Sequence, residues 1–76
     1  MGKKNAKERL DALVKHLNLS GYKASYNSYF KAVQVFVVDF AAASTVEMLK
    51  AEGYEAWSAL TGRVIGYSPQ AVVYAK

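Results

Sequence analysis

Side chains that could carry out covalent chemistry are few in this sequence and stand apart from one another. His16 is the only histidine, there is no cysteine, and the six acidic residues are scattered singly along the 76 positions. A nucleophile with its base, or a metal ion, needs several such groups together, and no serine lies in a G-x-S-x-G context. Neither G-x-x-x-x-G-K-S/T nor G-x-G-x-x-G occurs, so no loop is expected to cradle a phosphate. The sequence predicts no catalytic residues, no metal site and no cofactor, and hence a protein that is not an enzyme.

Aromatic residues are the unusual feature of the composition, with six tyrosines, three phenylalanines and one tryptophan. One face of a predicted hairpin combines aromatic, apolar and polar side chains and is the candidate binding site: Lys23, Phe30, Gln34, Phe36 and Val38. Aromatic side chains bring large, fairly rigid contact areas to protein interfaces. Phenylalanine interleaved with lysine or glutamine on an open sheet is also how single-stranded nucleic acid is held, by base stacking over a basic surface. A third interpretation is that so small a domain needs these rings to fill its core.

Positive charge is concentrated in the first part of the chain. The net charge is +4, and residues 1–31 contain seven basic side chains against two acidic ones. A basic patch made of Lys3, Lys4, Lys7, Arg9 and Lys15 could attract nucleic acid or an acidic protein surface by long-range steering. The alternative is that these charges only keep the N-terminus solvated.

The strand that must position the candidate site is the run from Ala32 to Phe40. It is apolar on both of its alternating faces, which predicts an interior strand over residues 32–39. A stripe of apolar residues predicts a helix over 5–19, with Asn5 as its cap. A two-residue turn at Asn27 and Ser28 would pair Tyr26 with Tyr29 and place the candidate site on the face away from the helices. The side chains predicted to be most buried are Leu13, Leu17, Val35, Val37 and Leu49.

A second helix is expected over residues 41–52, capped by Asp39 or by Ser44, and ended by Gly53. A second hairpin then turns at Thr61-Gly62, which would place Trp57 opposite Gly66. Pro69 is expected to break the sheet before a last strand over 71–75. No internal repeat is apparent in the sequence.

The expected order is α-β-β-α-β-β-β, in a two-layer α+β sandwich with a mostly antiparallel sheet and two helices on one face. This order resembles a ferredoxin-like sandwich whose first strand has moved to the C-terminus, and the resemblance covers element order alone. Residues 1–4 are expected to form a flexible basic N-terminus, and residues 5–76 a single domain. No signal sequence or membrane span is recognisable, so a cytoplasmic protein with no membrane partner is expected.

A binding module that acts by protein-protein contact is the function that these observations favour. Its size is that of the small regulators or inhibitors carried by phages and mobile elements. The alternative is a nucleic-acid-binding protein that uses the open sheet face together with the basic N-terminal half. Because Phe36 and Val38 are too apolar to be left bare, a homodimer is a further possibility.

Overall fold

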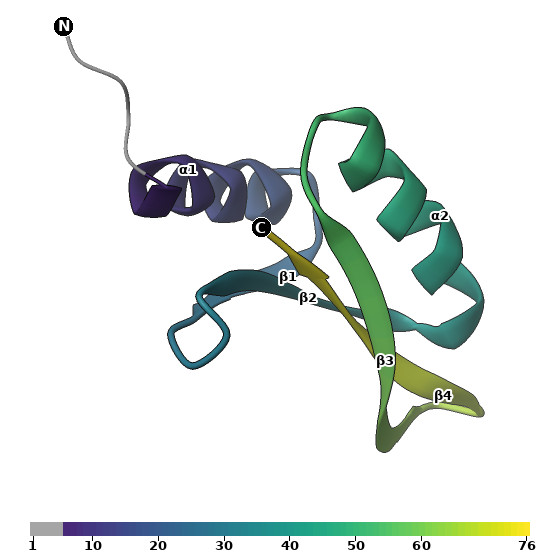
Figure 1. Cartoon of the computed structure of the whole chain (residues 1–76). Coiled ribbons are helices and arrows are strands. Elements are labelled where there is room, and N and C mark those ends of the chain that lie inside the picture. The colour runs from purple at the N-terminus through teal and green to yellow at the C-terminus, as the bar shows by residue number, and fades with distance from the viewer. Residues whose placement is uncertain (1–5) are drawn as a thin grey trace, which may run out of the picture.

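Two helices and four strands make up the described part of the chain, residues 6–76 of the computed structural model. In order they are α1 (Ala6–Leu19), β1 (Lys23–Asn27), β2 (Ala32–Val38), α2 (Asp39–Ala51), β3 (Ala56–Ile65) and β4 (Ser68–Ala75). Both helices lie on the same side of one sheet (Figure 1), which confirms the predicted two-layer α+β sandwich with one strand fewer than expected. The N-terminus predicted over residues 1–4 and the predicted cap Asn5 lie outside the described residues.

The four described strands form an antiparallel sheet in the order β1-β2-β4-β3. The apolar run at β2 is therefore an interior strand, as its two apolar faces predict. β2 and β3 both run antiparallel to β4, which lies between them, so β2, α2 and β3 form a split β-α-β unit. This unit is the one expected of a ferredoxin-like order with its first strand at the C-terminus. No helix within residues 6–76 is long and apolar enough to span a membrane.

Side chains from both helices and from the covered face of the sheet share one hydrophobic core. The predicted core residues Leu13, Leu17, Val35 and Leu49 are buried. Val37 is only half-buried, because it lies near the end of β2, where the chain turns into α2.

Helix α2 begins at Asp39 rather than at residue 41, and neither predicted cap forms. The N-cap is Val38, which makes no side-chain capping hydrogen bond. Asp39 lies in the first turn, where its carboxylate complements the helix dipole. The hydroxyl of Ser44 donates to the backbone oxygen of Ala41 (3.0 Å), so Ser44 is an interior helix residue.

The loop between β1 and β2 is longer than predicted and spans residues 28–31. Tyr26 pairs with Val33, so its predicted pairing with Tyr29 is wrong. The Asn27 side chain explains the longer loop, because its Oδ1 accepts the backbone N–H groups of Tyr29 (2.9 Å) and Phe30 (3.0 Å). The register differs from the predicted one by an even number of residues, so the strand residues stay on the faces predicted for them.

The second hairpin turns at Gly66 and not at Thr61-Gly62. Thr61 and Gly62 lie inside β3, within an irregularity of the β3–β4 register between Leu60 and Val64. Gly66 has φ 63° and supplies the turn, so β3 and β4 are longer than expected and no separate fifth strand exists among the described residues. Trp57 consequently pairs with Tyr74 instead of Gly66.

Pro69 does not break the sheet. It belongs to β4 and pairs with Val64 of β3. The β2–β4 pairing begins only at the next residue, with Gln70 opposite Val38. The missing N–H of Pro69 therefore leaves the β2–β4 ladder intact, and proline is tolerated near the start of the strand.

The predicted end of α2 at Gly53 is confirmed. Gly53 has φ 95°, its N–H donates to Lys50 O (3.0 Å), and the N–H of Tyr54 donates to Leu49 O (3.1 Å). These two hydrogen bonds define a Schellman motif, which satisfies carbonyls that the helix leaves free. Leu49 and Tyr54 both join the core and supply the apolar contact that accompanies this motif.

Helix α1 ends in the same way. Gly21 has φ 97°, and the N–H of Tyr22 donates to Leu17 O (3.0 Å). The segments LNLSGY (17–22) and LKAEGY (49–54) are thus equivalent, and each is followed by two strands. The chain consists of two α-β-β halves joined through β2 and β4. This similarity lies in the order of the elements, whereas the expectation of no internal repeat concerned the sequence.

Replacing Gly53 with alanine is expected to lower the free energy of unfolding by about 1 to 2 kcal/mol, because a left-handed backbone disfavours a Cβ atom. No atom lies within 4 Å of the place where that Cβ would stand, so the cost arises in the backbone alone. Denaturant unfolding measures the change. Gly53→Asn is the control and should cost less, since asparagine tolerates this conformation better. Equal losses for the two variants would contradict the assignment.

Candidate functional site

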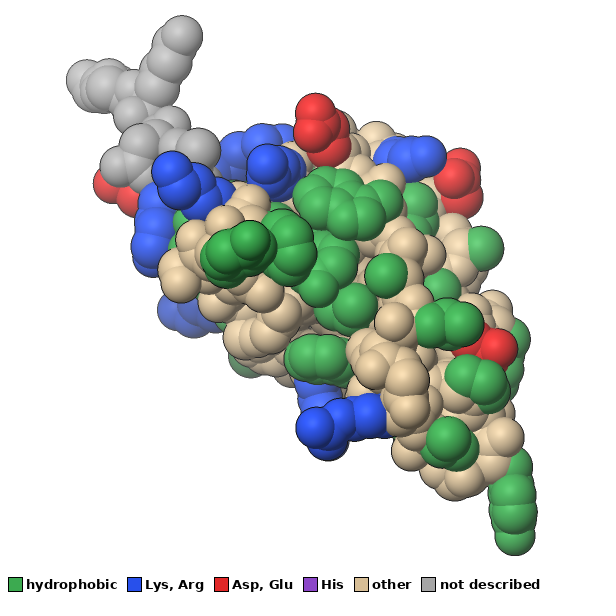
Figure 2. Space-filling model, turned by 60° about the horizontal axis from the view of Figure 1, so that its bottom comes forward, with side chains coloured by type: hydrophobic (Ala, Val, Ile, Leu, Met, Phe, Trp, Pro, Cys, Tyr) green, Lys and Arg blue, Asp and Glu red, His purple; other side chains and the backbone are tan. Residues whose placement is uncertain are grey.

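The side of the sheet opposite the helices carries the candidate site. Strand alternation and the observed register place a mixed set of aromatic, apolar and polar side chains there, called the open face. Figure 2 turns this side toward the viewer and shows hydrophobic side chains across its middle, with acidic side chains only at its margins. The open face includes Lys23, Ser25, Asn27, Gln34, Phe36, Val38, Trp57, Ala59, Thr61, Arg63, Gln70, Val72 and Tyr74.

Four aromatic rings cross this side in a connected series, called the aromatic row. The ring of Tyr29 meets Phe30 edge-on, with centroids 5.0 Å apart, and Phe30 lies 5.1 Å from Tyr74. Tyr74 in turn stacks against Trp57 at 5.4 Å, with an interplanar angle of 28°. Tyr29, Phe30 and Trp57 are exposed. The row therefore offers ring surface to a ligand along a path from the β1–β2 loop to the edge strand β3.

The loop end of the aromatic row is held in place by side-chain amides. Asn27 Nδ2 donates to Gln34 Oε1 (3.1 Å), and Gln34 Nε2 donates to Ser25 Oγ (3.0 Å). The same Asn27 accepts two backbone N–H groups of the loop that carries Tyr29 and Phe30. These hydrogen bonds tie the loop that carries Tyr29 and Phe30 to the end of β1 and to β2.

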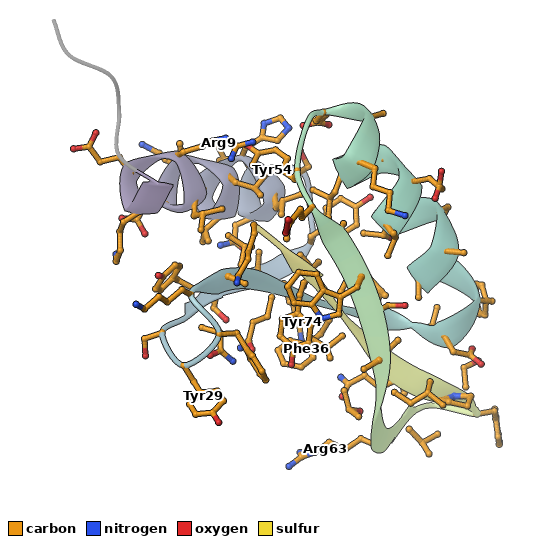
Figure 3. The ribbon with its side chains drawn as sticks, viewed as in Figure 1. Arg9, Tyr29, Phe36, Tyr54, Arg63 and Tyr74 are labelled. Carbon is orange, nitrogen blue, oxygen red and sulfur yellow. The ribbon has the colours of Figure 1, made fainter. Side chains whose placement is uncertain are left out.

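A depression of about 320 Å³ adjoins the aromatic row and is lined by Lys23, Phe36, Thr61, Arg63 and Gln70. The Thr61 hydroxyl donates to Gln70 Oε1 (2.9 Å), and it accepts the backbone N–H of Arg63 (3.2 Å). Figure 3 shows Arg63 reaching out from β3 on the side of the sheet to which Phe36 and Tyr74 also point. Arg63, within the irregular part of β3, therefore adds a cation to the open face.

The charge around the depression is positive. Its cations are Lys23 and Arg63, and neither its lining nor the aromatic row contains an aspartate or a glutamate. Glu55 and Lys76, whose backbones pair at the end of the β3–β4 ladder, place one charge of each sign at the edge of this side. Positive charge in the depression, beside exposed rings, favours an anionic ligand.

The five predicted binding residues all lie on the side of the sheet opposite the helices, but they contribute to different features there. Lys23 and Phe36 line the depression, Phe30 belongs to the aromatic row, and Gln34 joins the amide network. Val38 is half-buried opposite Gln70 at the end of β2, and it is neither part of the aromatic row nor of the lining of the depression. The sequence prediction did not include Trp57, Tyr74 or Arg63, because it assigned no faces to the second hairpin or to the last strand; Tyr74 faces the ligand side through the pairing of β4 with β2, and Trp57 through its pairing with Tyr74.

The predicted basic patch lies elsewhere. Lys7 and Arg9 are on α1, in the helix layer: Lys7 pairs with Asp11 (3.1 Å), and the Arg9 guanidinium lies 4.2 Å from the ring centroid of Tyr54. Figure 3 shows Arg9 and Tyr54 on the helix side of the sheet. Lys15 is exposed on the same helix, while Lys3 and Lys4 fall outside the described residues. Within residues 6–76, the predicted patch and the open face are therefore not one surface.

The chemistry of the open face is the basis for a functional argument, because a two-layer α+β fold is compatible with many functions. Exposed rings, two cations and several side-chain amides can bind a ligand, and none of them forms a set of nucleophile, base and orienting group. No protein-family model, no curated protein and no solved structure matches this chain.

Proposed function

We propose that this protein is a non-enzymatic binding module that holds single-stranded nucleic acid on its open face. The observation that carries the proposal is the aromatic row, flanked by a depression that is lined by the cations Lys23 and Arg63 and by no carboxylate. Every nucleobase has a π-face, so exposed rings can stack bases whatever their sequence. Cations beside the rings neutralise the phosphates that connect those bases.

The arrangement suits a single strand better than a duplex. Bases within a duplex are stacked on one another and cannot reach side-chain rings, whereas bases of a single strand can splay onto an open sheet. The rings of Phe30, Tyr74 and Trp57 lie on the sheet itself or against it, not at the tip of a long loop. A strand laid along the aromatic row would pass the depression, where Lys23 and Arg63 can meet its phosphates.

Titration of a fluorescent oligo-dT strand tests the proposal. Binding with a dissociation constant in the micromolar range is expected at low salt. The log-log dependence of affinity on salt should have a slope of about −1.4 for two phosphate contacts, and about −2 if Lys31 in the adjoining loop makes a third. Failure to bind even at low salt, or affinity that is insensitive to salt, would exclude this function.

Protein-protein contact is the second candidate, and a different surface favours it. The end of the β3–β4 hairpin exposes Leu60 (70%), Val64 (64%), Ile65 and Tyr67. Contiguous exposed apolar side chains commonly mark protein interfaces. A partner regulated or inhibited by this protein, or a second copy of it, could bind there while the open face stays free. Sedimentation over a range of concentrations distinguishes self-association from binding to another protein.

A further inference from the structure

In the depression beside the aromatic row, the side-chain groups that have no partner in the described part of the protein are hydrogen-bond donors more often than acceptors. Gln70 Oε1 accepts the hydroxyl hydrogen of Thr61, and the Thr61 oxygen accepts the N–H of Arg63. Within residues 6–76, the Gln70 Nε2 group, the Arg63 guanidinium and the Lys23 ammonium donate to no protein group. The free hydrogen-bonding groups of the depression are therefore mostly donors.

A donor-rich site discriminates between the purines. Guanine presents two acceptors, N7 and O6, on one edge, whereas adenine places an amino donor beside its N7. The planar fork of an arginine matches the guanine edge with two parallel hydrogen bonds, and this is the commonest specific base contact. Opposite adenine, the same fork would face a second donor. Lys23, on the other wall of the depression, remains available for a flanking phosphate.

We infer that the depression lined by Phe36, Arg63 and Gln70 receives one unstacked base of the bound strand and prefers guanine to adenine. The inference rests on the proposed function and assigns base recognition to one part of the open face. Phe36 supplies an apolar wall for the base, Arg63 reads its N7 and O6 atoms, and Gln70 donates to any remaining acceptor. The aromatic row binds the neighbouring bases without regard to sequence.

The test uses the full chain and oligo-dT strands of about nine nucleotides, a length within the usual site sizes for single strands. The central thymine is kept, or replaced by one guanine or one adenine, and affinities are compared by fluorescence anisotropy. The guanine strand should bind at least about fivefold more tightly than the adenine strand, since a bidentate contact typically discriminates by that much or more. A single guanine per strand avoids guanine-quartet assembly. Addition of 5′-GMP should also shift the side-chain amide resonances of Gln70 more than 5′-AMP does.

Arg63→Lys is the decisive variant, because it keeps the charge and removes the planar fork. The ratio of guanine-strand to adenine-strand affinity should fall to within about twofold, whatever change the substitution makes in the affinity for oligo-dT. Arg9→Lys, the same substitution on α1, is the control and should keep the preference. Equal binding of the guanine and adenine strands, or a preference that survives Arg63→Lys, overturns the inference and leaves the proposed function standing if oligo-dT still binds. Loss of all oligonucleotide binding in the parent protein overturns both.

Discussion

Leu17→Ala is expected to lower the free energy of unfolding by about 2 to 5 kcal/mol, through lost burial and the cavity left behind. Leu17 is 1% exposed, belongs to the core cluster, and also accepts the Tyr22 N–H that ends α1. A domain of this size has a total stability on the order of 4 to 11 kcal/mol, so the variant should unfold at much lower denaturant or be unfolded already. Circular dichroism during urea titration measures the change.

Leu19→Ala is the matched control for this prediction. It makes the same substitution two residues further along α1, where the side chain is 81% exposed. The expected change is within about 0.5 kcal/mol, as for most surface positions. Similar losses at Leu17 and Leu19 would show that α1 packs on the sheet through a different face.

Trp57→Ala is expected to weaken binding of oligo-dT by roughly 5- to 150-fold, the usual cost of removing a ring that stacks on a base. The indole is exposed on the edge strand β3 and stacks on Tyr74, so its loss removes one end of the aromatic row. Fluorescence anisotropy at low salt measures the affinity. An unchanged unfolding midpoint and far-ultraviolet circular dichroism spectrum would show that the variant remains folded.

Tyr67→Ala is the control for the loss of an aromatic ring away from the site. Tyr67 is 104% exposed at the hairpin tip and takes no part in the aromatic row. Its removal should leave the affinity within about twofold, because no base is expected to stack there. Equal losses for Trp57→Ala and Tyr67→Ala would contradict the assignment of the binding face.

The fold class was predictable because its signals are local or periodic. The two-faced apolar run of β2, the leucine stripe of α1 and the glycine that ends α2 each follow from a few neighbouring residues. The sheet faces of the first hairpin were also predicted, although the register was not. The predicted register is wrong by an even number of residues, which leaves each side chain on the same face of the sheet. The residues predicted for this part of the candidate site are therefore on the predicted face.

The second hairpin was not predictable in the same way, because two glycines compete for its turn. Gly62 and Gly66 both have positive φ, and only the pairing of β3 with β4 decides that the first lies in a bulge and the second in the turn. Trp57 and Arg63 share one strand and one face because the turn lies beyond both of them, whereas Tyr74 faces the ligand side because β4 pairs with β2. The aromatic row therefore depends on tertiary pairing that no local pattern encodes.

The division into two α-β-β halves has a consequence for how the binding surface forms during folding. Most contacts within a half join residues close in the sequence, whereas Gln34 and Tyr74 at the middle of the sheet become neighbours only when β2 pairs with β4. Closing such a long loop is the entropically slow part of folding. The rings of Phe30 and Tyr74 belong to different halves, so the ligand-binding surface is complete only after the halves have docked. A ligand that contacts both halves would bind only the docked state and would therefore stabilise it. We expect such a ligand to slow the separation of β2 from β4 and to protect their amide hydrogens from exchange.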